Sequence, residues 1–174
     1  MKGMVTVLSS TKSSYIAKGG LFVTITIIIL YSTTFVQFNT LFLIGIASSI
    51  IPLCLINTDL KTSFLVYLAS SILGYFILPV KSVWMLYTIL FGPYGIVKYF
   101  AERLRNAPIE IVCKLIYFNS LTLLTFYLYK IFFAPNFVLP YNIILIILGA
   151  QIAFYIFDYA LTVFINAFSK YNIK

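Results

Sequence analysis

The stretch YIAKGGLFVTITIIILYSTTF, residues 15–35, contains Lys18 as its one charged side chain. A helix needs about 20 predominantly apolar residues to cross a hydrocarbon core about 30 Å thick. The stretch is also longer than the apolar core of a signal peptide, and it lacks a small-residue cleavage site. We therefore predict that it forms a first membrane-spanning helix.

The composition extends this prediction to the whole chain. Of its 174 residues, 62% are hydrophobic and 9% are charged, and the mean hydropathy is +1.05. These values lie outside the range of an ordinary soluble domain. We predict an all-α membrane protein in which a compact bundle of six transmembrane helices forms a single integral-membrane domain over residues 1–174. Dividing the chain at its polar and proline-containing breaks gives spans at 15–35, 39–57, 62–78, 82–100, 109–133 and 139–164.

The basic residues predict how the chain is oriented. With both termini in the cytoplasm, ten of the 12 Lys and Arg residues lie on that side, and Lys81 and Lys130 lie on the other. Such an excess of cytoplasmic cations is the usual pattern of multi-pass proteins. We therefore expect a cell-membrane protein with both termini cytoplasmic. A nucleic-acid partner is not expected, because the sequence predicts no water-facing domain to carry a basic patch.

The residue types argue against catalysis by this chain. Histidine is absent, and the sequence contains no P-loop, no G-x-S-x-G motif and no acid-rich metal motif. We predict that the chain is not an enzyme and that it holds no cofactor and no metal ion. Cys54 and Cys113 are expected near the cytoplasmic ends of spans, where conditions are reducing, so no disulfide is predicted.

Polar and aromatic side chains are expected at membrane depth in the last three spans. Such groups tend to face a cavity or another helix, so they could line a cavity open to the outer face. An interfacial aromatic belt is an alternative for Trp84, and hydrogen bonding between helices is equally open for Asn119 and Gln151. The candidate substrate-binding residues are Trp84, Tyr87, Asn119, Tyr127, Asn142, Gln151 and Tyr155.

Small side chains recur on one face of the first span. Ser13, Ala17, Gly20 and Thr24 follow one another at intervals of four, three and four residues, which places them on the same side of a helix. Small residues allow two helix backbones to approach closely in lipid. The face could pack within the bundle, or it could be a partner-docking surface for a separate membrane subunit.

The segment FGPYGIVKYFAERLRN, residues 91–106, predicts a kinked fourth span. Pro93 cannot donate a backbone hydrogen bond, and the carbonyl group that it leaves free needs a neighbouring helix, a water or a ligand. The charged residues that follow are typical of a water-facing helix end, where Glu102 could pair with Lys98. Asp158 is the one acid within an apolar run, and pairing with a Lys or Arg explains it more simply than a proton relay does.

The six-span layout, the first helix TKSSYIAKGGLF and the basic loop between the fourth and fifth spans resemble the substrate-binding S components of energy-coupling-factor (ECF) transporters. Ala17 matches an alanine of that family's small-residue motif, whereas Gly19 and Gly20 replace others. The resemblance implies a pocket near the outer face that binds a vitamin or related micronutrient. It also implies docking of the first helix on a membrane coupling subunit that is served by two ATPase subunits.

Two other function classes stay open. The chain could be a membrane interaction or assembly protein without a ligand, whose polar residues only hold the helices together. It could also act on lipid, although the lack of histidine and the scarcity of acids disfavour this. Lys81 and Lys130 are the basic residues expected near the outer face, so a substrate with an anionic group is plausible.

Overall fold

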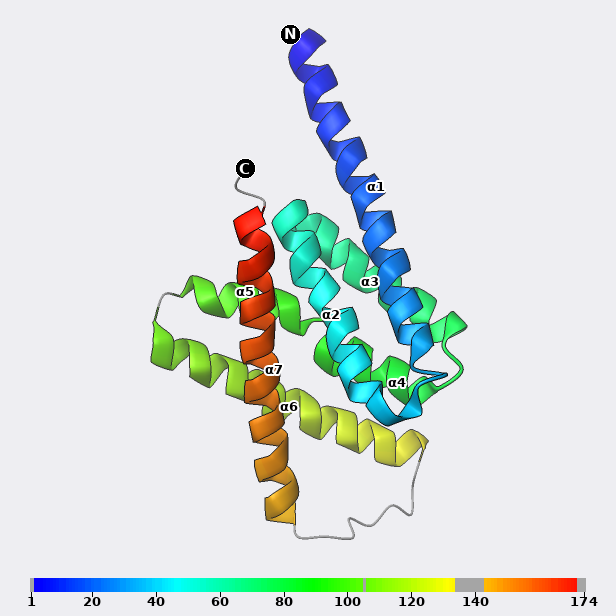
Figure 1. Ribbon diagram of the computed structural model, residues 1–174, viewed down its shortest axis with the longest axis vertical. Coiled ribbons are helices and arrows are strands. Elements are labelled where there is room, and N and C mark those ends of the chain that lie inside the picture. The colour runs from blue at the N-terminus through cyan, green and yellow to red at the C-terminus, as the bar shows by residue number, and fades with distance from the viewer. Residues whose placement is uncertain (1, 105, 134–142, 172–174) are drawn as a thin grey trace. The chain divides into compact units, whose positions relative to one another are not determined.

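The structure, a computed structural model, describes residues 2–104, 106–133 and 143–171 (Figure 1). Within these ranges the chain is helical and contains no strand, so the predicted all-α class is confirmed for them. The chain divides into two compact units, Met1–Phe100 (unit 1) and Ala101–Lys174 (unit 2). The predicted single domain over residues 1–174 stays a prediction.

The described residues are divided among the following helices. They are α1 (Lys2–Ser32), α2 (Thr40–Asn57), α3 (Leu60–Ile77), α4 (Lys81–Leu86), α5 (Tyr94–Arg103), α6 (Ala107–Phe132) and α7 (Ile143–Tyr171). A short 3₁₀ helix, η1 (Gln37–Asn39), precedes α2, and a π-helix, η2 (Tyr87–Phe91), follows α4.

Five helical segments are long and apolar enough to cross a membrane, counted over the described residues. They are Lys12–Ser32, Thr40–Asn57, Leu60–Ile77, Ala107–Phe132 and Ile147–Phe168. These segments fit a multi-pass membrane protein. The predicted fourth span, 82–100, is not among them, because its residues are divided between α4, η2 and α5.

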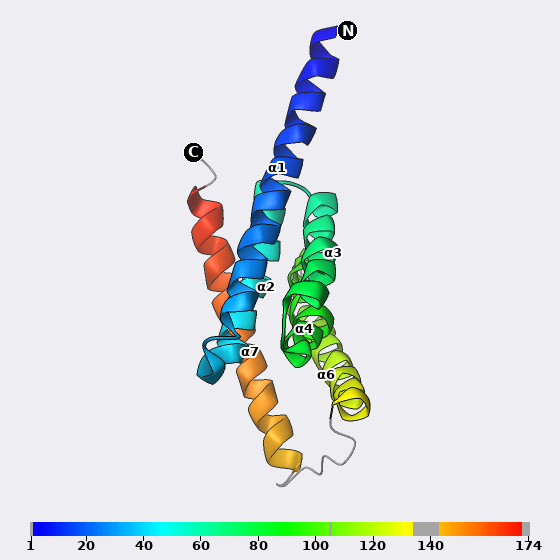
Figure 2. The same ribbon diagram turned by 90° about the vertical axis from the view of Figure 1, so that its right-hand side faces the viewer.

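In unit 1, α1 packs against both α2 and α3 (Figures 1 and 2). Its inward face carries Phe22, Thr26 and Leu30, which are buried. Phe22 joins a cluster with Cys54 of α2 and Val66 of α3. A larger cluster joins α1 and α2 to the segment that follows α3: Leu30, Ile44, Ala47, Ile51, Leu78, Val83 and Tyr87.

The connection between α2 and α3 is set by a helix cap. Asp59 precedes α3, and its Oδ1 accepts a hydrogen bond of 3.0 Å from the backbone N–H of Thr62. An N-terminal cap of this kind satisfies one of the free N–H groups of the first turn. Hydrogen bonds from Thr62 therefore hold the pKa of Asp59 below its usual value, and Lys61 adds a smaller electrostatic effect.

Helix boundaries differ from the predicted spans chiefly at charged or polar ends. α1 begins at Lys2 rather than at residue 15, and its N-terminal part extends past α2 and α3 (Figures 1 and 2). α3 begins at Leu60 rather than at residue 62 because Asp59 caps it. Hydropathy marks the apolar part of a helix, whereas the helix itself continues into water as long as its backbone is satisfied.

Candidate functional site

The break in the fourth predicted span lies at Gly92 and Pro93. The backbone N–H of Gly92 donates to the carbonyl oxygen of Tyr87 at 2.7 Å, which is the wide π-helical pattern. In that register the carbonyl of Thr88 would accept from residue 93, which is proline and has no N–H. The Tyr67 hydroxyl of α3 donates to this carbonyl instead, at 2.9 Å. A neighbouring helix therefore supplies the partner that the proline removes.

Two glycines let the break lie close to α2 and α3. A Cβ added at Gly92 would lie 2.8 Å from Cε2 of Tyr67, and one added at Gly95 would lie 2.6 Å from Cδ of Pro52. Cβ atoms essentially never approach other atoms within 3.0 Å. Glycine is therefore required at both positions by the close approach of neighbouring side chains.

Trp84 and Tyr87, both predicted to bind substrate, make hydrogen bonds to α3. The indole Nε1 of Trp84 donates to the carbonyl oxygen of Ser71 at 2.7 Å, and its ring lies edge-to-face with Tyr75 at 5.0 Å. Tyr87 is wholly buried, and its hydroxyl lies 2.8 Å from the Ser70 hydroxyl. The residues of α3 that lie against Trp84, Tyr87 and Thr88 share one face of that helix, a signal that was available in the sequence and was missed: Tyr67, Ser70, Ser71 and Gly74.

Asn119 and Gln151 meet in unit 2. Nε2 of Gln151 donates to Oδ1 of Asn119 at 2.6 Å, and Nδ2 of Asn119 donates to the carbonyl oxygen of Leu115 at 2.9 Å. The side-chain oxygen Oε1 of Gln151 is buried and accepts no hydrogen bond from the described part of the chain. The structure thus joins the two amides that the sequence could assign either to each other or to a ligand.

The remaining predicted pocket residues are less enclosed. Tyr127 of α6 is 63% exposed and Tyr155 of α7 is 47% exposed. Asn142 lies outside the described residues. The predicted set is thus divided between the two compact units, with Trp84 and Tyr87 in unit 1 and the described others in unit 2.

The small-residue face of α1 is exposed along its length. Ser13, Ala17, Gly20 and Thr24 are all exposed, and a Cβ added at Gly20 would meet nothing within 4 Å. The Thr24 hydroxyl donates to the carbonyl oxygen of Gly20 at 3.0 Å. Gly19 lies on the other side of the helix, where an added Cβ would be 3.2 Å from Cγ2 of Thr62. Packing of α1 within unit 1 therefore uses Gly19 and leaves the Gly20 face uncovered.

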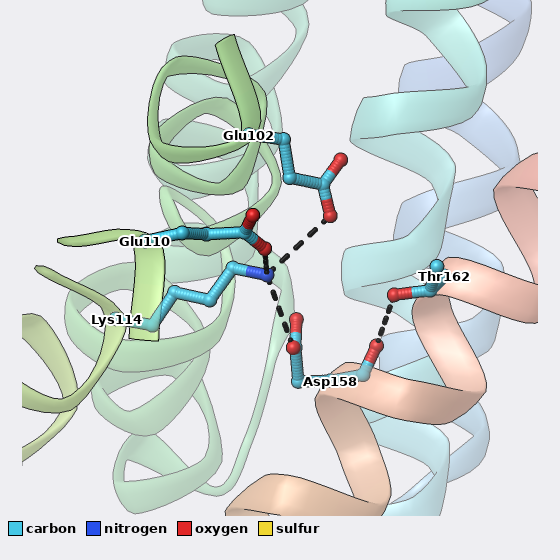
Figure 3. Close-up of polar contacts among 5 residues, drawn as sticks. All are labelled: Glu102, Glu110, Lys114, Asp158 and Thr162. Carbon is cyan, nitrogen blue, oxygen red and sulfur yellow. Dashed lines mark hydrogen bonds and ion pairs between the residues drawn. The ribbon is translucent and has the colours of Figure 1, made fainter. Parts of the chain in front are cut away.

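A charged cluster forms in unit 2 around Lys114 (Figure 3). Its Nζ lies 2.5 Å from Glu110, 3.1 Å from Asp158 and 3.4 Å from Glu102. The Lys114 side chain is 6% exposed. A buried ammonium requires paired carboxylates, and these three come from α5, α6 and α7. The expected pairing of Asp158 with a basic residue is confirmed. Glu102 contacts Lys114 as well, and its expected pairing with Lys98 stays a prediction.

Charge pairing holds the cluster together. The three hydrogens of an ammonium group can each serve one carboxylate, so Lys114 can join all three helices at one point. No group of three or more His, Cys, Asp and Glu side chains in the described chain is arranged to hold a metal ion. The cluster therefore joins the end of α5 and the start of α6 to the middle of α7.

No family model, curated protein or solved structure matches this chain.

Proposed function

We propose that this chain is the substrate-binding membrane subunit of an ATP-driven uptake transporter for a micronutrient, a vitamin or a related small organic molecule. ATP hydrolysis takes place on partner subunits, and the chain itself is not an enzyme. It crosses the cell membrane six times, with α4, η2 and α5 together forming the fourth crossing. Both termini are cytoplasmic.

The observation that carries this proposal is the uncovered small-residue face of α1. The inward face of the helix is occupied by α2 and α3, whereas Ser13, Ala17, Gly20 and Thr24 are exposed. Helices associate in lipid where small residues allow the backbones to approach. A face that is small and uncovered is suited to a helix of a membrane coupling subunit.

The proposed binding residues offer one defined polar contact. Oε1 of Gln151 is an acceptor without a partner in the described chain, while Asn119 fixes the other end of the same amide. The exposed rings of Tyr127 and Tyr155 provide apolar surface in the same unit. Ligand sites generally combine aromatic walls with a few placed polar groups. The proposed substrate therefore donates a hydrogen bond to Gln151.

Docking is tested by co-purification with the membrane coupling subunit and the ATPase subunits of such a transporter. Gly20→Leu fills the open face and is expected to abolish co-purification. Gly149→Leu is the matched control, because Gly149 is also a helical glycine with nothing within 4 Å of an added Cβ. Equal co-purification of the two variants and the unaltered protein would overturn the proposed docking face.

Ligand binding is tested on the purified protein with a panel of vitamins. Binding of one member, weakened by Gln151→Leu, is the expected result. If no vitamin binds and no coupling subunit co-purifies, the transporter assignment is wrong.

An assembly protein without a ligand is the second candidate, favoured by the internal bonds of the predicted pocket residues. Trp84 and Tyr87 bond to α3, and Asn119 bonds to Gln151. On this reading, Asn119→Leu and Gln151→Leu lower stability and leave uptake of any substrate unchanged. Loss of uptake at unchanged stability favours the transporter subunit.

A further inference from the structure

The Tyr67 hydroxyl of α3 lies beside more acceptors than it can serve. It donates to the carbonyl oxygen of Thr88 at 2.9 Å. Ser71 follows Tyr67 by one helical turn, and its hydroxyl is close enough to that of Tyr67 to interact with it. The hydroxyl oxygens of Ser71 and Thr88 are nevertheless buried and make no hydrogen bond within the described part of the chain. A tyrosine has one O–H to donate, so the bond to the Thr88 carbonyl leaves Ser71 without a donor.

Ser71 also lacks the usual partner within its own helix. A buried hydroxyl in a helix commonly donates to a carbonyl group of the preceding turn. Thr26 of α1 does so, with its hydroxyl 2.8 Å from the carbonyl oxygen of Phe22. The corresponding carbonyl for Ser71 is that of Tyr67, which already accepts from the Ser70 hydroxyl at 3.0 Å. Ser71 therefore depends on a partner outside the preceding turn of its backbone.

The Thr88 carbonyl has a second possible donor in the π-helix η2 itself. The backbone N–H of Gly92 donates to Tyr87, five residues earlier, at 2.7 Å. In an α-helix the same N–H would donate to Thr88, four residues earlier. The change of register would end there, because the next residue, Pro93, has no N–H to move. Either Tyr67 or Gly92 can therefore satisfy the Thr88 carbonyl.

Each register of η2 gives the Tyr67 hydroxyl a different partner. In the π-helical register it serves the Thr88 carbonyl, and Ser71 has no donor. In the α-helical register Gly92 would serve that carbonyl, and the released Tyr67 hydroxyl could donate to Ser71. Two packings that differ by so few hydrogen bonds form an element that a ligand or a partner can bias.

We propose that η2 switches between a π-helical and an α-helical register, with the Tyr67 hydroxyl moving from the Thr88 carbonyl to Ser71. A π-helical turn holds more residues than an α-helical turn, so closing it changes the direction in which α5 leaves the break. α5 begins at Tyr94, and the chain enters unit 2 at Ala101. The switch therefore acts on the segment that connects the two units, and it does not depend on what the chain binds.

The amide of Gly92 can be observed alone. Gly92 is the one glycine of the chain that follows a phenylalanine. Full-length protein labelled with ¹³C at the phenylalanine carbonyl and ¹⁵N at glycine, reconstituted in nanodiscs, therefore gives a single signal in a carbonyl-correlated NMR spectrum. A register that changes within microseconds to milliseconds produces relaxation dispersion of this signal, and a slower change produces two signals. We expect the unaltered protein to show one of the two.

Two substitutions should shift the register in opposite directions. Tyr67→Phe leaves the Thr88 carbonyl without a donor in the π-helical register only, so it favours the α-helical register. Ser71→Ala removes the partner of Tyr67 in the α-helical register, so it favours the π-helical one. Each population ratio should change about two- to tenfold, as expected for one hydrogen bond. Ser63→Ala is the matched control, because Ser63 is a buried serine of α3 that donates to its own backbone turn.

The three variants give clear contrary outcomes. A single sharp Gly92 signal without relaxation dispersion in every protein would overturn the switch. Shifts in the same direction for Tyr67→Phe and Ser71→Ala would also overturn it, because these substitutions remove the partners of different registers. An equal shift in Ser63→Ala would show an effect of packing and would overturn the proposal. Ser71→Ala keeps the test decisive if Tyr67→Phe does not fold, since it should reduce the α-helical population by itself.

Discussion

The two units hold their helices together by different means. In unit 1, α3 and the broken fourth span are joined by neutral hydrogen bonds, from Tyr67 to Thr88 and from Trp84 to Ser71, and by glycines in close contact. In unit 2, α6 and α7 meet through long side chains that form an ion pair, an amide pair and a ring stack.

This difference follows from how closely the backbones approach. Small residues in unit 1 bring carbonyl groups within reach of neighbouring side chains, so uncharged donors are sufficient. In unit 2 the stacked rings of Phe118 and Phe154, 4.3 Å apart, separate the helices, and only long polar side chains span the gap. We therefore expect unit 1 to be sensitive to added side-chain volume. We expect unit 2 to be sensitive to changes in side-chain charge.

The largest expected effect is loss of the buried cation. Lys114→Met leaves Glu102, Glu110 and Asp158 without the ammonium that they share, and breaking a buried pair in this way costs about 3–5 kcal/mol. Denaturant unfolding in detergent measures the loss. Lys130→Met is the control, because Lys130 is exposed and should change the free energy of unfolding little. Equal free energies of unfolding for the two variants would contradict the conclusion that charge pairing stabilises unit 2.

Added volume should be most harmful in unit 1. Gly95→Ala places a Cβ 2.6 Å from Cδ of Pro52, and such overpacking costs about 1–3 kcal/mol. Gly149→Ala adds the same methyl group where nothing lies within 4 Å, so helix propensity should stabilise it by about 0.5–1 kcal/mol. Thermal unfolding of both variants is the measurement, and shifts of the same sign would contradict the close contact.

The bond from Tyr67 is expected to hold the π-helical break in place. Tyr67→Phe leaves the Thr88 carbonyl without its donor, at a cost of about 1–3 kcal/mol. Trp84 is the one tryptophan of the chain and bonds to the same helix, α3, so its fluorescence should report a change in the packing of the break against α3. Tyr155→Phe is the control, because its ring is exposed, and it should change neither the free energy of unfolding nor the fluorescence of Trp84.

The sequence predicted the helical class because apolar runs of about 20 residues have few other solutions in a membrane. It also predicted the kink at Pro93 and the pairing of Asp158, since each follows from one residue type in an apolar setting. The partner of the freed carbonyl could not be predicted. Tyr67 precedes Thr88 by 21 residues, and which helix lies against the break depends on tertiary packing.

The candidate site was less predictable for the same reason. Asn119 and Gln151 were recognised as polar groups at membrane depth, yet whether they face each other or a ligand depends on how α6 and α7 are rotated. The Lys114 cluster was missed as a cluster because its members are separated by up to 56 residues, from Glu102 to Asp158. Charge pairing alone does not specify which of several lysines an acid meets.

The cap of α3 should give unit 1 a measurable dependence on pH. Because the folded pKa of Asp59 is lowered, its carboxylate stabilises the fold above pH about 4, and this contribution is lost as the pH falls through the folded value. Asp59→Ala removes the cap at a cost of about 1 kcal/mol at neutral pH. Asp59→Asn keeps a cap and should flatten the acid limb of the stability profile, and an unchanged acid limb would contradict the assignment.

The smallest effect concerns the amide pair of unit 2. A double-mutant cycle with Asn119→Leu and Gln151→Leu should give a coupling energy of about 0.6 kcal/mol, the average for side-chain hydrogen bonds between membrane helices. The value is small because the unfolded helices also find partners within the bilayer. If the coupling approaches the cost of Lys114→Met, the amides and not the charged cluster hold α6 to α7. A coupling near zero together with lost ligand binding would instead assign Gln151 to a substrate.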